Sequence, residues 1–364
     1  MYALIHLPPD LIDAILPFLP PKSLGRFKSV SKRWYSLISS PNFIKTHTQM
    51  FNKKNPNPDP THLILLPNVG DYSFYSLDIK QINTQTTPAT VTAKRLKLQK
   101  PCYWILGSCN VLVLAYGRPR NIYLVNPTTN ETLKVPGGRY NYTYGFGYDS
   151  STDDYKVISI PFKGVQNSDP DTKFVRVYSL RNNSWKKFPN PPNQLHDYCS
   201  PHPGLLLNKN LHWIVGGGCL RITIASFSLA DEEFHIIESP DFVNRVEKSW
   251  SRLFALGEKL AAVICFWLHD CGFVNELWVM EEYGVPKSWM KLCNIEYDND
   301  QRGCEFYAKV NNQDIWVGNR DVGEICIYNT NERRYTSVTV KGCCEDFIVY
   351  GTYVESLESL ERFR

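Results

Sequence analysis

Apolar residues recur with two different periods along this chain. Over residues 1–50 they return every three or four positions, which is the spacing of helices that each bury one face. From residue 61 onward they alternate with polar residues in short segments rich in Val, Ile, Tyr, Phe and Trp, a pattern typical of β-strands. Residues 52–60 contain three prolines and no apolar side chain. We therefore expect a small all-α domain at 1–50, a linker at 51–60 and an all-β domain at 61–364.

Three to four short helices are expected in the N-terminal domain, because prolines interrupt its apolar pattern. The apolar positions are, in chain order, Leu11, Ile12, Ile15 and Leu16, then Leu24, Phe27 and Val30, then Trp34, Leu37 and Ile38, and finally Phe43, Ile44 and His47. Asp10, Ser31 and Ser40 are expected to cap these helices. So few residues cannot bury a large core, which favours a module that docks on a partner.

The segment LPPDLIDAILPFLPPKSLGRFKSVSKRWYSLI resembles the F-box, the motif by which adaptor subunits attach to the Skp component of cullin-based ubiquitin ligases. Lys22-Ser23-Leu24 and Val30-Ser31-Lys32 are similar to the plant form. Pro17 departs from the polar residue usual in the family, and we expect it to shorten the first helix without moving Ile15 or Leu16. The alternative is that these apolar residues are only the inside of a helical bundle. The resemblance implies that a Skp-type adaptor is bound by Leu7, Pro8, Leu11, Ile15, Leu16, Leu19, Pro20, Leu24, Phe27, Val30 and Trp34.

A unit of about fifty residues repeats through the β-domain. Taking Tyr75, Val125, Tyr178, Phe227, Val279 and Tyr328 as equivalent positions, the successive separations are 50, 53, 49, 52 and 49 residues. A second hairpin lies between these positions, at 102–116, 144–160, 205–215, 253–266 and 306–317. Four strands per repeat predict a β-propeller, and six repeats predict six blades with four antiparallel strands each.

The first repeat lacks this second hairpin, and residues 347–356 at the C-terminal end supply strands that can complete it. Such a closure hides the unpaired edges of an open sheet. An open solenoid and a two-sheet sandwich contain the same kind of strands, and both stay open as alternatives at this point.

The β-domain also resembles a known family. Gly107-Ser108-Cys109-Asn110, Gly145-Phe146-Gly147-Tyr148-Asp149, Asn183-Ser184-Trp185 and Leu211-His212-Trp213 are similar to motifs of the F-box-associated, kelch-like domain of plant F-box proteins. That family includes S-locus F-box-like proteins and F-box proteins that control immune receptors. Val111 and Lys209 stand where the family usually has glycine. Both positions are predicted turns, so local geometry is affected and the fold is not.

Composition narrows the possible functions. The eleven cysteines are an odd number without CxxC spacing, which favours reduced, mostly buried thiols. The net charge of +4 is small and dispersed, so we expect no nucleic acid partner. The longest apolar run, Leu260 to Leu268, has nine residues, and no basic residue precedes the first apolar stretch. We expect no membrane insertion and a location in the cytoplasm, the nucleus or both.

Candidate catalytic and metal-binding residues are few. The chain has no GxSxG elbow, and Gly145-Phe146-Gly147 lacks the third glycine of a phosphate-binding loop. Asp149, Asp153 and Asp154 do not follow the EF-hand pattern and are expected to cap a turn. His212 lies in a predicted strand beside aromatic residues, where a buried core histidine is expected. We predict no catalytic residue, no metal and no cofactor.

The links between hairpins are the predicted target-binding surface. In a four-stranded meander the turns inside hairpins lie at one end of a blade and the links between hairpins at the other. The links are longer and more varied, and they are rich in arginine and aromatic residues, which are common in binding hot spots. The alternative is that long links simply tolerate insertions. The predicted surface comprises Arg118, Arg120, Arg139, Tyr140, Tyr142, His196, Tyr198, Arg245, Trp250 and Arg302.

Together the resemblances imply a non-catalytic substrate-recognition subunit of an SCF-type cullin ubiquitin ligase. The F-box would bind the Skp adaptor and, through it, the cullin and RING subunits, while the propeller binds a target protein for ubiquitination and proteasomal degradation. Bringing the target close to the ubiquitin-conjugating enzyme raises its effective concentration. One alternative is an F-box interaction module that acts outside degradation, and another is a propeller enzyme that carries an F-box.

Overall fold

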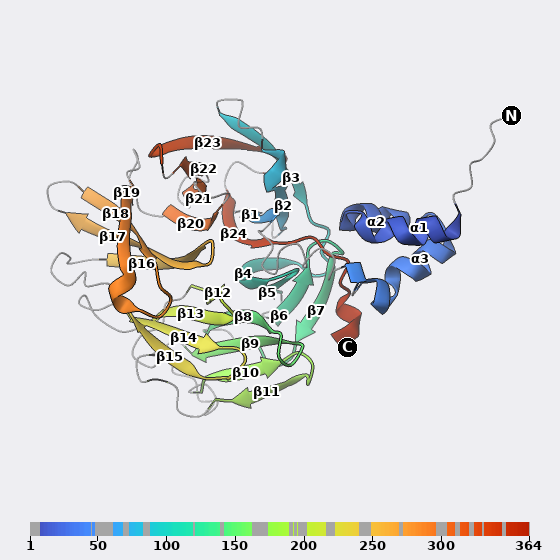
Figure 1. The fold of residues 1–364 in the computed structure, drawn as a ribbon, viewed down its shortest axis with the longest axis horizontal. Helices are drawn as coiled ribbons and strands as arrows, with labels where there is room; N and C mark the ends of the chain where they lie inside the picture. Colours follow the sequence, from blue (N-terminus) through green and yellow to red (C-terminus); the bar gives the residue numbers. More distant parts are fainter. Residues whose placement is uncertain are drawn as a thin grey trace.

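A small helical unit lies beside a ring of β-sheets in the computed structural model (Figure 1). The structure describes residues 8–44, 46–47, 61–67, 73–82, 88–118, 121–138, 142–161, 174–188, 192, 195, 202–215, 223–239, 249–268, 272–295, 304–309, 314–319, 324–329, 331–343 and 347–363.

The helical unit contains α1 (Pro9–Ile15), the 3-10 turn η1 (Leu16–Phe18), α2 (Pro21–Phe27) and α3 (Lys32–Ser39). Residues 41–44 and 46–47 are helical as well. Pro17 has no backbone N–H to donate into an α-helix, and α1 accordingly gives way to η1 after Ile15. The predicted shortening of the first helix is confirmed.

Two of the three predicted caps are confirmed. The Ser31 hydroxyl accepts a hydrogen bond from the Trp34 N–H at 3.1 Å, and the Ser40 hydroxyl accepts one from the Phe43 N–H at 3.2 Å. The prediction for Asp10 is wrong, because α1 begins after Pro8 and no side chain caps it. Asp10 lies inside the first turn, where its negative charge interacts favourably with the positive end of the helix dipole.

Four sheets contain four strands each, and every sheet is a meander in sequence order. Their strands are β4 (Cys102–Cys109), β5 (Leu112–Gly117), β6 (Asn121–Asn126) and β7 (Glu131–Val135); β8 (Tyr142–Asp149), β9 (Asp154–Pro161), β10 (Arg176–Ser179) and β11 (Ser184–Lys187); β12 (Leu205–Leu207), β13 (Asn210–Val215), β14 (Thr223–Ser228) and β15 (Phe234–Glu238); β16 (Ser249–Leu256), β17 (Lys259–Leu268), β18 (Gly272–Met280) and β19 (Trp289–Ile295).

The fifth sheet has eight strands, in the order β20-β21-β22-β23-β3-β2-β1-β24. These strands are β20 (Cys304–Lys309), β21 (Asp314–Asn319), β22 (Glu324–Asn329), β23 (Arg334–Lys341), β3 (Ala89–Arg95), β2 (Tyr75–Asp78), β1 (His62–Pro67) and β24 (Phe347–Tyr353). Short 3-10 turns lie at Ile79–Gln81, Pro286–Ser288 and Leu360–Phe363.

The ring closes through the last strand of the chain. β24 pairs antiparallel with β1, with His62 opposite Tyr353 and Pro67 opposite Phe347. β24 also contacts β4 on one side and β20 on the other, so the innermost strands follow one another around the ring. The predicted completion of the first repeat by the C-terminal end is therefore confirmed, and the open solenoid and the sandwich are excluded.

The described strands form five sheets, so the predicted number of six blades is not confirmed. The difference arises at the outer edge, where β23 pairs in parallel with β3, from Val338 opposite Ala89 to Lys341 opposite Thr92. That pairing joins two sets of four strands into one sheet. The repeat period is nevertheless correct, because the six equivalent positions fall in β2, β6, β10, β14, β18 and β22, each the third strand of four counted from the centre of the ring.

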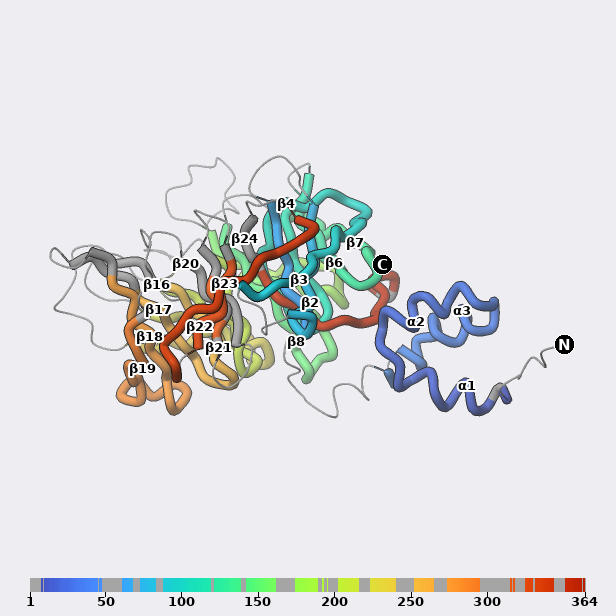
Figure 2. Tube along the Cα trace, turned by 90° about the horizontal axis from the view of Figure 1, so that it is seen from above, coloured from blue at the N-terminus to red at the C-terminus, as the bar shows by residue number. Residues whose placement is uncertain are grey.

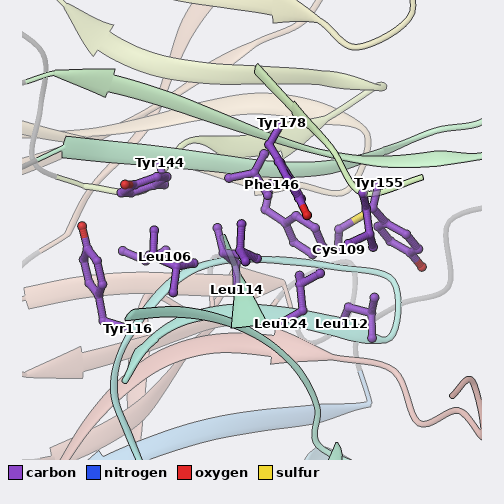
Figure 3. Close-up of a cluster of buried hydrophobic side chains, with 14 of the residues drawn as sticks. Leu106, Cys109, Leu112, Leu114, Tyr116, Leu124, Tyr144, Phe146, Tyr155 and Tyr178 are labelled. Atoms are coloured by element: carbon purple, nitrogen blue, oxygen red, sulfur yellow. The ribbon is translucent and has the colours of Figure 1, made fainter. Parts of the chain in front are cut away.

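Large apolar side chains fill the space between neighbouring sheets (Figure 3). Leu114 and Leu124 come from one sheet and Phe146 and Tyr178 from the next, and each is at most 2% exposed. Gly145 allows the sheets to approach closely, since a Cβ there would lie 2.4 Å from the Trp213 ring. The glycines at 145 and 147 therefore serve packing, as expected for a segment that is not a phosphate loop.

Candidate functional site

The helical unit buries a small core of its own. Leu16, Leu24, Ile38 and Phe43 lie in it, each at most 7% exposed. His47 is also buried, and its Nε2–H donates to the Leu19 carbonyl oxygen at 2.9 Å. Burial lowers the pKa of His47, and the hydrogen bond to Leu19 opposes this only in part.

A second set of apolar side chains in the helical unit faces outward. Leu11, Ile15 and Phe18 are 50%, 48% and 70% exposed, and their spacing of four and three residues puts them on one face of α1 and η1. Val30 and Tyr35, in the α2–α3 turn and on α3, are 60% and 58% exposed. Burying a side chain of this size contributes about 1.5–3 kcal/mol, so this face is suited to a protein partner.

The predicted adaptor-binding residues divide between the core and the surface. Pro8, Leu11, Ile15, Pro20 and Val30 are exposed, and Leu19, Phe27 and Trp34 are half-buried. Leu16 and Leu24 are buried, so they can take part in adaptor binding only by supporting the exposed face from inside. Leu7 lies outside the described residues.

Two exposed residues of this face are absent from the sequence prediction. Phe18 follows Ile15 by three positions and Leu11 by seven, and this helical spacing was the available signal. Tyr35 had no such signal, because the neighbouring Trp34 packs edge to face against Phe27 at 5.3 Å and fits the helical pattern better.

Two family models match the chain, one for each structural unit. Residues 4–46 match the F-box domain, and residues 68–360 match the F-box associated beta propeller domain. The chain belongs to this family of F-box proteins. Neither matching family is a family of enzymes.

The curated relatives are plant F-box proteins, in agreement with the sequence resemblance. F-box protein CPR1 of Arabidopsis thaliana is 28% identical over 315 residues, which are 80% of this chain and 73% of that protein. F-box/kelch-repeat protein At3g23880 of Arabidopsis thaliana is 27% identical over 306 residues, 81% of each chain. A chain of the solved nidogen/laminin complex aligns at 10% identity over 80% of this chain and 97% of that chain, with a TM-score of 0.45, and this weak likeness carries no argument.

Most of the predicted target-binding residues fall outside the described part of the propeller. These are Arg120, Arg139, Tyr140, His196, Tyr198, Arg245 and Arg302, and for Trp250 only the backbone, in β16, is described. Arg118 is exposed at the end of the β5–β6 hairpin, where its backbone N–H donates to the Pro101 carbonyl oxygen at 3.2 Å.

Tyr142 is a correction to that prediction. It is 4% exposed and belongs to the core between the β4–β7 and β8–β11 sheets of the propeller. The link ends at this residue and β8 begins, so the pleat of the strand turns the ring inward. The guanidinium of Arg176 lies 5.7 Å from the centre of the Tyr142 ring and 4.5 Å from that of Trp185. The ring thus stabilises the sheets and is not available to a target.

A polar contact joins the F-box to the propeller. Lys22 of α2 forms an ion pair with Glu355, and its ammonium group donates to Nε2 of His62 at 3.1 Å. His62 lies within 2.8 Å of the Thr61 hydroxyl through Nδ1, and its ring stacks on Tyr353 at 5.0 Å. Burial, with a smaller contribution from the charge of Lys22, lowers the pKa of His62 to about 4, so the ring is neutral at pH 7 and can accept from Lys22.

The residues weighed for catalysis have structural partners. The His212 ring is buried, its Nδ1–H donates to the Leu205 carbonyl oxygen at 3.2 Å, and its Nε2 accepts from the Tyr283 hydroxyl at 2.7 Å. Burial lowers the pKa of His212 to about 4. Asp149 accepts from Ser151 and Thr152 in the β8–β9 turn. The predictions of a core histidine and a turn-capping carboxylate are confirmed.

Most of the cysteines whose side chains the structure describes lie in the interior. Cys102, Cys109, Cys293 and Cys326 are buried and Cys343 is half-buried. Burial raises the pKa of Cys102 and of Cys109 to about 12, so neither is a ready nucleophile. Among the described residues, no group of three or more His, Cys, Asp or Glu side chains is placed to hold a metal ion, and no helix is long and apolar enough to cross a membrane.

Proposed function

We propose that this protein is the substrate-recognition subunit of an SCF-type ubiquitin ligase. The observation that supports this best is the exposed apolar face of the F-box, formed by Leu11, Ile15 and Phe18. The F-box binds a Skp-type adaptor through this face and thereby joins the cullin and RING subunits. The complex acts in the cytoplasm or the nucleus, and the subunit itself contributes no catalytic residue.

The propeller binds the target protein at the end where the links between hairpins lie. The F-box is attached at the other end, because its contacts go to the start of β1, where Lys22 meets His62, and to the segment that follows β24. The end of the ring that carries the links is therefore left unobstructed by the F-box. A target held there is brought close to the conjugating enzyme, and proximity accelerates transfer of ubiquitin to its lysines.

Co-purification from the full-length protein tests the adaptor assignment. Replacing Ile15 and Phe18 together with aspartate should abolish capture of the Skp adaptor and cullin, because two charges then face an apolar partner surface. The matched control replaces Met290 and Leu292, which are 54% and 46% exposed on β19 of the propeller, with aspartate. That control should capture the adaptor like the wild type. Adaptor capture by the Ile15 and Phe18 variant at wild-type yield would contradict the proposal.

An F-box module that acts outside degradation is the second candidate, and it predicts the same adaptor contact. The two differ in the fate of the bound protein. If partners captured by the propeller keep the same half-life when residues 8–47 are deleted, the degradation role is wrong and the second candidate stands.

We also infer that the eight-stranded sheet represents two blades that share an outer edge. Its halves, β20 to β23 and β24 with β1 to β3, each repeat the four-strand order of the other sheets. Replacing Val338 and Val340 of β23 with proline would disrupt the β23–β3 pairing, which runs from Val338 to Lys341. A ring that keeps cooperative unfolding in this variant supports two blades, and a ring that opens argues for one continuous sheet.

A further inference from the structure

The segment after β24, residues 354–363, is tied closely to the propeller. The side-chain amide of Asn126 donates to the carbonyl oxygens of Ser356 at 3.3 Å and Glu358 at 2.7 Å. The Ser356 N–H in turn donates to the Thr128 hydroxyl at 3.2 Å. These contacts hold the segment against the β6–β7 turn.

Farther along, the same segment enters the core of the propeller. The Glu131 carboxylate accepts from the Leu360 N–H at 2.7 Å, and Leu360 is 1% exposed in the apolar cluster that also contains Leu114 and Phe146. Phe363 packs edge to face on Tyr155 at 5.9 Å. The segment therefore spans two sheets, β4–β7 and β8–β11, and is fixed at both.

Between these anchors, Leu357 points the other way, into the F-box. It is 3% exposed and shares one apolar cluster with Leu16, Leu24, Ile38 and Phe43. Figures 1 and 2 show the red C-terminal trace running from the ring to the side that faces the blue helices. Leu357 is thus a core residue of a domain that ends more than 300 residues earlier in the sequence.

Charged and polar groups also connect the segment and the propeller to α2 of the F-box. Glu355, two residues before Leu357, forms the ion pair with Lys22 of α2, and Lys22 also donates to His62 of β1. Leu24, two residues after Lys22, contacts the Leu357 cluster. One helix of the F-box is therefore held by an ion pair and an apolar contact that both come from the segment.

We propose that residues 354–363 are a structural part of the adaptor-binding module. Leu357 completes the core of the F-box, and the segment holds the docking helices in one orientation on the propeller, so adaptor binding depends on residues at the far end of the sequence. This inference rests on the proposed function for its adaptor. Its physical reason is size, because a domain of about forty residues buries too little apolar surface to be rigid alone.

Full-length Leu357→Asp, Leu357→Met and Leu277→Ala variants test the proposal. Leu357→Asp should weaken binding of the purified Skp adaptor at least tenfold and speed hydrogen exchange of amides in α2 and α3, with propeller amides unchanged. Leu357→Met should restore both. Leu277→Ala is the control from a separate part of the propeller core, on β18, and it should lower the melting temperature of the propeller while adaptor affinity stays within about threefold.

Small-angle scattering of the same proteins measures the orientation. The Leu357→Asp variant should have a larger radius of gyration than the wild type, because its F-box is no longer held against the propeller. Wild-type adaptor affinity and wild-type exchange in the Leu357→Asp variant would overturn the proposal. If the wild type itself fails to bind the adaptor while helix exchange still depends on Leu357, the proposed function fails and the structural role of Leu357 stands.

Discussion

The F-box and the propeller differ in how much of their apolar surface they bury. The propeller closes a ring through β24 and buries aromatic and aliphatic residues between neighbouring sheets. The F-box buries few side chains, one of them Leu357 from outside its own sequence, and leaves Leu11, Ile15 and Phe18 in contact with water. A domain that must offer apolar surface to a partner keeps less for its own core. The structure supplies the missing part from the larger domain.

Removing the closing strand should have the largest effect on this comparison. A chain that ends at Gly342 lacks β24 and the 354–363 segment, which leaves β1 unpaired on its inner edge. We expect aggregation and no cooperative thermal unfolding, measured by calorimetry and light scattering. A soluble truncated chain that melts cooperatively would show that the ring does not need its last strand.

Breaking a buried charge cluster should come next, and it affects the propeller alone. Lys156 is 5% exposed and lies 3.0 Å from the Asp149 carboxylate and 2.9 Å from the Glu232 carboxylate. The ion pair with Glu232 joins the β8–β11 sheet to the β12–β15 sheet. Burial favours neutral Asp149, but hydrogen bonds from Ser151, Thr152 and Lys156 outweigh it and hold the pKa of Asp149 below its usual range.

Lys156→Met leaves that carboxylate buried without its cation, so urea unfolding should show a loss of about 3–5 kcal/mol. Lys186, 69% exposed beside Glu232 at 3.0 Å, is the matched control. Its change to Met should cost about 1 kcal/mol or less. Equal losses for the two variants would mean that burial does not determine the strength of this cluster.

Two neighbouring residues separate core from docking surface within the F-box. Leu16→Ala removes a side chain that is 2% exposed and should destabilise the F-box by about 2–5 kcal/mol, measured by hydrogen exchange in α2 and α3. Ile15→Ala, at 48% exposure, should change exchange little and weaken adaptor binding about tenfold. If Ile15→Ala sped exchange and Leu16→Ala changed only adaptor binding, Ile15 would be the core residue and Leu16 the docking residue.

Acid should weaken both regions through buried histidines. Burial lowers the pKa of His62, at the joint, and of His212, in the propeller, to about 4 from an ordinary value of 6.5. Between pH 6.5 and about 4, these histidines are therefore protonated in the unfolded chain and neutral in the folded chain. The contribution of each histidine to the free energy of unfolding is fully present above pH 6.5. It falls by up to about 3 kcal/mol as the pH drops to 4.

The difference between wild type and His212→Gln in urea unfolding at pH 7 and pH 4.5 isolates this effect from the carboxylates. The gap between the two proteins should shrink at the lower pH. A gap that stays constant would show that the proton uptake of His212 is the same in both states.

The smallest expected effect lies in one turn of the propeller. Asn208 and Lys209 have φ of +49° and +63°, a left-handed conformation that costs a non-glycine residue roughly 1 kcal/mol. Lys209→Gly should therefore raise the stability of the propeller by up to about 1 kcal/mol in urea unfolding. Val111, in the β4–β5 turn, differs, because Asn110 takes the positive φ of +53° there. Val111→Gly should be destabilising, since Val111 is buried.

The repeats of the β-domain could be predicted from the sequence because each strand pairs with its neighbour in the chain. Tyr178 and its equivalents occur at a constant interval, and local turns specify the meander. The parallel pairing of β23 with β3 joins residues about 250 positions apart, and no local pattern records it. For the same reason the expected six separate sheets became five.

The sequence predicted the apolar residues of the F-box helices, but it did not separate buried from exposed residues. Helical spacing marks Ile15 and Leu16 alike as apolar, because the core and the docking surface are adjacent on α1 and η1. Only the packing shows that Leu16 is buried and Phe18 exposed. Leu357 lies in no helix or strand and follows no period, so sequence pattern could not connect it to the F-box.

The position of Leu357 has a consequence for biosynthesis. A ribosome makes the F-box before it makes the closing strand and Leu357, so about 300 residues must be added after the F-box before its core can be completed. On the proposal made above, an interrupted chain has neither a closed ring nor a competent F-box. Chains whose synthesis stops before Leu357 should therefore not occupy the adaptor.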